Sequence, residues 1–196
     1  MNPCRTALHG PRFRRTKPSF VGAVRRSDFV LVEVGQGHTV ARMSTLSPRL
    51  AEIVNALPIR SGMRVLEIGC GPGAAARAVA AQLGTGHILA VDRSAKAIAQ
   101  AEQQSLAEIA SGRMSLRQVS AGELVLLPGE DPFDLAFAVR VGALDGRHPE
   151  AGREALARIA VVLRPGGRLF VDGGRPLREV PLPPVIDRQL SIESRD

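Results

Sequence analysis

A short glycine-rich segment constrains the fold of this chain more than any other feature. Residues 64–73 read Arg-Val-Leu-Glu-Ile-Gly-Cys-Gly-Pro-Gly, and an alanine-rich stretch with helical character follows over 74–83. A strand, a glycine turn and a helix in that order build a pocket for a nucleotide-sized ligand at the carboxyl end of the strand. Glycine is needed where the backbone takes a positive φ or lies against a ligand with no Cβ between them. The segment therefore predicts a ligand-binding turn.

Apolar runs alternate with segments of helical periodicity through most of the chain. Strands are predicted at 63–68, 87–91, 114–119, 133–139 and 168–171, and helices at 48–57, 74–83, 95–111 and 149–163. The first helix has Ser47 as its N-cap with Pro48 at the first position, and Ser94 caps the long third helix. Strands that alternate with helices imply right-handed crossovers and a parallel sheet. The expected fold class is α/β, with a doubly wound parallel sheet.

Charge and proline content divide the chain into three parts. Residues 1–42 hold eight basic and two acidic side chains, so they carry six of the seven net positive charges of the 196-residue chain. We expect a basic, disordered N-terminal arm at 1–42, a cofactor-binding domain at 43–175 and a proline-rich tail at 176–196. We also hypothesise that the arm is dispensable, since Met43 would serve as an alternative start.

The composition argues against several classes of protein. The domain after the arm is almost neutral, and the chain has no Trp or Tyr, so a nucleic-acid-binding face is not expected. No apolar run is long enough for a transmembrane helix. Two cysteines cannot form a disulfide framework, which favours a reducing cytoplasm. The sequence predicts no metal ligand.

Taken in order along the chain, the motifs resemble those of the class I S-adenosylmethionine-dependent methyltransferases. The glycines at 69, 71 and 73 follow the acidic Glu67, and Asp92 ends the second predicted strand. Phe133-Asp134-Leu135 opens the fourth strand, and Pro165-Gly166-Gly167 precedes the fifth. A nicotinamide-dependent oxidoreductase would space its glycines differently. The resemblance implies a Rossmann-like sheet of strand order 3-2-1-4-5.

The same resemblance implies S-adenosylmethionine as the cofactor. Asp92 would accept hydrogen bonds from the ribose hydroxyls, and Glu67 would act on the cationic amino and sulfonium end. Backbone N–H groups of the turn and of the helix start would hold the methionine carboxylate. The full set of expected cofactor-binding residues is Glu67, Gly69, Cys70, Gly71, Gly73, Asp92, Arg93, Ser120, Ala121 and Val139.

Two features depart from the family pattern. Many members carry an acidic residue after strand three that meets the adenine amino group, whereas this chain reads Val119-Ser120-Ala121-Gly122-Glu123, so the acid is missing or shifted. Ser120 could supply one hydrogen bond instead. The family usually ends in a helix and an antiparallel hairpin, which we expect to be short or missing here, with one short strand around 185–190. A partner subunit or a second copy of the chain could then cover the acceptor side.

The methyl acceptor is less well defined. Methyl transfer is an in-line displacement on an electrophilic sulfonium, and the protein chiefly positions the two reactants. After strand four, Arg140 could bind an acidic acceptor and His148 could act as a base, but no catalytic residue is assigned. We predict a methyltransferase that acts on a small molecule. The alternative is a non-catalytic cofactor-binding subunit or a degenerate methyltransferase domain.

Overall fold

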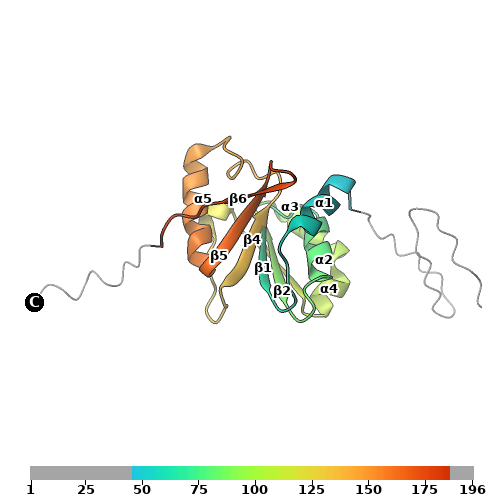
Figure 1. The fold of residues 1–196 in the computed structure, drawn as a ribbon. Helices are drawn as coiled ribbons and strands as arrows, with labels where there is room; N and C mark the ends of the chain where they lie inside the picture. The colour runs from blue at the N-terminus through green and yellow to red at the C-terminus, as the bar shows by residue number, and fades with distance from the viewer. Residues whose placement is uncertain (1–45, 186–196) are drawn as a thin grey trace, which may run out of the picture. The chain divides into compact units, whose positions relative to one another are not determined.

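The computed structural model describes residues 46–185, in which six strands form one sheet. The strand order is β3-β2-β1-β4-β5-β6 (Figure 1), so the predicted order 3-2-1-4-5 is confirmed. The first five strands are parallel, and β6 is antiparallel to β5. Their bounds are β1 Arg64–Ile68, β2 His87–Asp92, β3 Met114–Gln118, β4 Phe133–Ala138, β5 Leu163–Asp172 and β6 Leu177–Val180.

Helices cover both faces of this sheet. Figure 1 shows α1, α2, α3 and α4 on one side of the strands and α5 on the other. Consecutive residues of a strand point to opposite faces, and in β1 Val65 joins the core under α2 whereas Leu66 joins the core under α5. The helices are α1 Pro48–Ala56, α2 Ala74–Ala80, α3 Ala95–Gln104, α4 Leu106–Ala110 and α5 Pro149–Val162, with a 3₁₀ turn η1 at Ala121–Glu123.

The first helix begins as the sequence predicts. The Ser47 hydroxyl accepts a 3.3 Å hydrogen bond from the Leu50 N–H, and Pro48 occupies the first helical position. The apolar residues Ile53 and Val54 are buried, and Val54 belongs to the core under α2. A side-chain cap and a proline at this position both fix the start of a helix from local sequence alone.

The predicted single helix after Ser94 is wrong, because it breaks at Ser105 into α3 and α4. Ser105 is fully buried, and its hydroxyl accepts a 3.3 Å hydrogen bond from Arg77 Nη1 on α2. Leu106 beyond the break is 68% exposed, so it does not continue the buried stripe. A contact with a different helix therefore overrides the local periodicity.

The C-terminal half of the sheet also differs from expectation. Strand β5 begins at Leu163 instead of Arg168, because the Arg164–Gly167 segment forms an irregularity opposite β4 before regular pairing resumes. Strand β6 lies at Leu177–Val180, inside the segment expected to be a tail, so the sheet extends beyond residue 175. A strand is also expected near 185–190. Residue 185 does not belong to a strand, and residues 186–190 lie outside the described residues.

The chain divides into two units between Met43 and Ser44, and all described residues belong to the second unit. The predicted basic arm therefore lies outside the described residues. Within residues 46–185, no helix is both long enough and apolar enough to cross a bilayer.

Candidate functional site

The glycine turn lies at the carboxyl edge of the sheet, between β1 and α2. The N–H groups of Gly69 and Cys70 both donate to the Val91 carbonyl of β2, at 2.8 and 3.0 Å. Gly69, Gly71 and Gly73 have φ values of +72°, +52° and +75°. Each lies in the left-handed region that favours glycine, so the backbone path explains why the motif contains three glycines.

The three glycines differ in what surrounds them. A Cβ on Gly69 would stand 2.6 Å from Val141 Cγ2, and one on Gly73 would stand 3.2 Å from the Cβ of Ala101. Apart from Gly71 itself and its two chain neighbours, no protein atom lies within 4 Å of the corresponding position at Gly71. Gly69 and Gly73 thus permit close packing inside the protein, whereas Gly71 leaves space that a ligand could contact.

Asp92 is held beside this turn by two backbone hydrogen bonds. Its Oδ2 accepts from the Gly71 N–H at 2.9 Å, and its Oδ1 accepts from the Ser94 N–H at 2.8 Å. A carboxylate oxygen can accept two hydrogen bonds, so both oxygens keep capacity for a further donor. The carboxylate is therefore oriented and partly exposed, as a pair of vicinal hydroxyls would require.

Glu67 is buried at the base of the site. The residue is 3% exposed, and Oε2 has no hydrogen-bond partner. Burial raises the pKa of its carboxyl to about 8, although a hydrogen bond from the Ala76 N–H and the Arg77 charge oppose the rise. A buried polar atom without a partner is costly and calls for an explanation. A cationic ligand group nearby would supply one.

Cys70 is packed in the turn and is not a reactive thiol. It is 6% exposed, and its Sγ contacts the Gly71 carbonyl oxygen at 3.6 Å. Burial, with the nearby Glu67 and Asp92 charges, raises the pKa of the thiol to about 12. Because the thiolate is the nucleophile, this residue contributes its backbone and its volume to the turn.

Four turn amides are already used inside the protein. Besides Gly69 and Cys70, the Gly71 N–H donates to Asp92 and the Gly73 N–H donates to the Cys70 carbonyl at 2.9 Å. These four groups do not offer free donors to a carboxylate, contrary to our expectation for the turn. The amides orient Asp92 and fix the shape of the turn instead.

The segment after β3 places the expected adenine-side residues next to each other. The Ser120 hydroxyl donates a 2.6 Å hydrogen bond to Glu123 Oε2, and Ala121 begins η1. The Val119 N–H donates to the Asp92 carbonyl at 3.0 Å, which ties this segment to the end of β2. The hydroxyl hydrogen of Ser120 is thus occupied, and the nearest acid stands at position 123, three residues further along.

The remaining expected residues lie along the same edge. Arg93 is exposed directly after Asp92, and its carbonyl accepts a 3.4 Å hydrogen bond from Gln118 Nε2. Val139 follows β4, is half-buried and packs against the core under α2. The ends of β1, β2, β3 and β4 therefore bring the expected cofactor residues to one edge of the sheet.

The two acceptor-side candidates belong to one loop. Arg140 is exposed and has a φ of +59°, the one positive φ of a non-glycine residue in the described part of the chain. His148 is exposed at the start of α5, where its carbonyl accepts from the Gly152 N–H at 2.8 Å. Between them, Asp145 and Arg147 form a 2.6 Å ion pair.

Sequence reasoning missed Asp172 at the end of β5. Its Oδ1 accepts a 2.9 Å hydrogen bond from the Arg140 N–H. An acidic residue that closes a strand was the available signal, because the carboxyl ends of parallel strands share one edge.

Comparison with known proteins agrees with this geometry. A family model described as a methyltransferase domain matches residues 65–167, which is more than half of the chain. A protein-L-isoaspartate O-methyltransferase from Methylorubrum populi is 34% identical over 169 residues, covering 80% of this chain and 70% of that protein.

Two solved structures share the fold. The [4+2]-cyclase SpnF has a TM-score of 0.53 and 30% identity, with 63% of this chain and 43% of that chain covered. Phosphoethanolamine N-methyltransferase 2 from Haemonchus contortus, in complex with S-adenosyl-L-methionine, has a TM-score of 0.51 and 27% identity, with 63% and 27% covered. The match spans less than half of each of these structures.

The chain belongs to the class I S-adenosylmethionine-dependent methyltransferase family. Three features of the structure agree with this family: the strand order, the turn with three glycines of positive φ, and the acid at the end of β2. The turn and the acid lie inside the matched segment.

Proposed function

We propose that the carboxyl edge of β1 to β4 binds S-adenosylmethionine and that the domain transfers the methyl group to an oxygen of a small-molecule acceptor. The observation that carries this proposal is the pairing of Gly71 with Asp92. The Gly71 N–H orients the carboxylate, while the space beside its Cα is open. A ligand can therefore touch the backbone and the acid together.

Each residue would have a distinct part in binding. Asp92 would accept hydrogen bonds from the ribose hydroxyls, and Gly71 would let the backbone meet the amino-acid part of the cofactor. Glu67, whose Oε2 has no partner, would face the cationic end. Ser120 and Ala121 would line the adenine side, and Val139 the side towards the acceptor.

The cofactor supplies an electrophilic methyl group on a sulfonium, so the chain has mainly to position an acceptor and exclude water. Arg140 lies on the loop after β4, and its guanidinium would attract an acidic acceptor. His148 lies on the same loop and would take a proton if the acceptor arrives protonated. An oxygen as the acceptor atom is supported by the relative from Methylorubrum populi, whose name specifies O-methylation of a protein L-isoaspartate. That name supports the acceptor atom and not the small-molecule class of the acceptor.

The partner that covers the acceptor side and the location of the protein in the cell are proposed as well. Strand β6 is a short edge strand, so a partner subunit or a second copy of the chain would complete the acceptor side. We also propose that the protein lies in a reducing cytoplasm, because its two cysteines cannot form a disulfide framework.

Titration calorimetry of the purified chain with S-adenosylmethionine and S-adenosylhomocysteine tests the cofactor assignment. We expect both to bind, and we expect Asp92→Ala to weaken binding by at least about tenfold, because hydrogen bonds to a charged group are lost. Asp131→Ala is the matched control, since Asp131 is an exposed acid at the opposite edge of the sheet. Failure of folded wild-type protein to bind either compound would contradict the proposal.

Methyl transfer is tested separately. Incubation with isotopically labelled cofactor and cell extract, followed by mass analysis, should reveal a small molecule that gains one methyl group. Label found on protein, on nucleic acid or on a nitrogen atom would refute the acceptor class proposed here.

A further inference from the structure

Asp172 connects the end of β5 with the point where the chain leaves β4. Its side chain is 15% exposed, and its Oδ1 accepts the Arg140 N–H at 2.9 Å. Its Oδ2 lies 3.7 Å from Arg49 Nη2, which is too long for a hydrogen bond. The contact with Arg140 is therefore the stronger of the two.

Arg140 has a backbone conformation that needs support. Its φ of +59° is uncommon for a residue with a side chain, and such conformations persist when surrounding contacts enforce them. A hydrogen bond from an N–H to a carboxylate is stronger than one between neutral groups. The Asp172 carboxylate thus supplies the contact that favours this conformation.

The conformation of Arg140 decides where Val141 lies. Val141 Cγ2 occupies the space beside Gly69, at 2.6 Å from where a Cβ would stand. The Val141 carbonyl then accepts the N–H groups of Leu144 and Asp145 at 2.9 and 3.1 Å, which fixes the next turn of the loop. A contiguous path therefore runs from Asp172 through Arg140 and Val141 to the glycine turn.

We propose that Asp172 is a positioning residue of the methyl-donor site: it holds the left-handed Arg140 backbone, and this places Val141 against Gly69. The inference rests on the proposed function, in which the glycine turn binds S-adenosylmethionine. Without the carboxylate, Arg140 relaxes towards a right-handed conformation. Val141 then moves away from Gly69, and the turn loses the wall that shapes it.

The first test compares three substitutions by calorimetry with S-adenosylhomocysteine and by thermal unfolding. Asp172→Ala should weaken binding by about tenfold or more. It removes the charged acceptor of the Arg140 N–H, so Val141 is no longer held against Gly69. Asp172→Asn should stay within about threefold of wild type, since its amide oxygen can still accept the Arg140 N–H. Arg49→Ala is the control: it removes the longer contact and should change binding by less than about twofold.

The second test is rescue by glycine. Glycine takes a positive φ without support, so Arg140→Gly in the Asp172→Ala background should restore most of the lost S-adenosylhomocysteine affinity. A role of Asp172 in general stability would not predict this recovery. If Asp172→Ala alone does not fold, recovery of folding and binding in the double variant supports the proposal, and failure of that variant overturns it.

Three other results would overturn the proposal: wild-type affinity in Asp172→Ala, loss of affinity in Arg49→Ala equal to that in Asp172→Ala, or no rescue by Arg140→Gly. If the wild-type protein binds no S-adenosylhomocysteine, the proposed function fails. Amide hydrogen exchange then tests the positioning role of Asp172 without any ligand. Exchange at Val141 should then be faster in Asp172→Ala than in Arg49→Ala, and equal rates would refute the inference.

Discussion

At the scale of single residues, Gly71 separates a binding role from a structural one. A Cβ at this position meets no protein atom, so Gly71→Ala should fold with a loss of about 1 kcal/mol for the positive φ. The added methyl group would project into the space assigned to the ligand. We expect S-adenosylhomocysteine to bind at least about tenfold more weakly by calorimetry, about 1.4 kcal/mol.

Gly129 provides the matched control for this substitution. Its φ is +77°, and a Cβ there also meets no atom within 4 Å, but it lies in the loop that leads into β4. Gly129→Ala should lower thermal stability to a similar extent and leave affinity unchanged. Equal affinities for the two variants would show that the open space beside Gly71 is not the ligand site.

Glu67 makes the stability of the protein depend on pH. Burial raises the pKa of its carboxyl from 4.5 to about 8, so between these values the unfolded chain has lost the proton that the folded chain still holds. Unfolding releases this proton, and stability from this group therefore falls as pH rises from about 4.5 to 8. Glu67→Gln removes the effect, so its melting temperature should exceed that of wild type by more at pH 8.5 than at pH 5.

Thermal unfolding in buffers across this range measures the difference. Glu52→Gln, on the exposed face of α1, controls for the loss of one negative charge. A gap between Glu67→Gln and wild type that stays constant or narrows as pH rises would contradict the assignment of a neutral, buried carboxyl.

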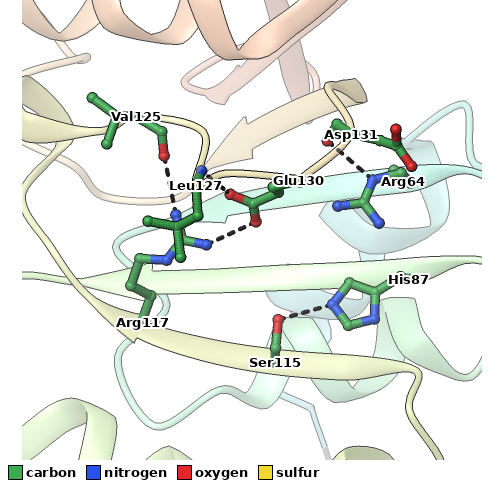
Figure 2. A network of polar contacts seen from close by, with 8 residues as sticks. All are labelled: Arg64, His87, Ser115, Arg117, Val125, Leu127, Glu130 and Asp131. Atoms are coloured by element: carbon green, nitrogen blue, oxygen red, sulfur yellow. Dashed lines mark hydrogen bonds and ion pairs between the residues drawn. The ribbon is translucent and has the colours of Figure 1, made fainter.

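At the scale of elements, one ion pair ties the loop before β4 to β3. Arg117 donates to the Val125 carbonyl at 3.1 Å and to Glu130 Oε1 at 2.7 Å, and Glu130 Oε2 accepts the Leu127 N–H at 2.9 Å (Figure 2). Burial alone would raise the pKa of Glu130, but these hydrogen bonds and the arginine charge lower it below 4.5. The lowered pKa indicates that the loop favours the charged carboxylate.

Glu130→Gln should therefore destabilise the protein by about 1 kcal/mol at pH 7, as expected for a partly exposed charge-assisted hydrogen bond. A group with a lowered folded pKa stabilises the protein above its unfolded pKa of 4.5 and loses this effect as pH falls through the folded value. Chemical denaturation at pH 7 and pH 3 measures the change. The deficit should shrink at pH 3, and a larger deficit there would refute the role of the charge.

The same scale shows which elements the sequence could predict. Helix α1 and the buried strands follow from neighbouring residues, namely the Ser47 cap, Pro48 and uninterrupted apolar runs. The break at Ser105 does not, because it depends on Arg77 of another helix. Strand β6 was hidden because prolines around it indicated a tail, whereas pairing with β5 supplies its order.

The candidate site likewise contains residues whose placement the sequence predicts and contacts that it does not predict. The glycine turn and Asp92 are adjacent to strand ends, so their spacing predicts their meeting at one edge. The contact between Asp172 and Arg140 joins residues that are 32 positions apart in the sequence, and predicting it requires the β4–β5 pairing to be known. The hydrogen-bond partners of the turn amides could not be predicted either, since the sequence does not specify which acceptor an N–H group finds in the fold.

At the scale of the whole molecule, the net charge and the fold lie in different parts of the chain. Six of the seven net positive charges fall within 1–42, whereas the sheet, its helices and the candidate site lie within 46–185. A chain that starts at Met43 should therefore keep its melting temperature and its affinity for S-adenosylhomocysteine, while its isoelectric point falls. Circular dichroism, calorimetry and isoelectric focusing of the two chains measure these three properties. Loss of folding or of binding in the shorter chain would show that the basic segment contributes to the domain.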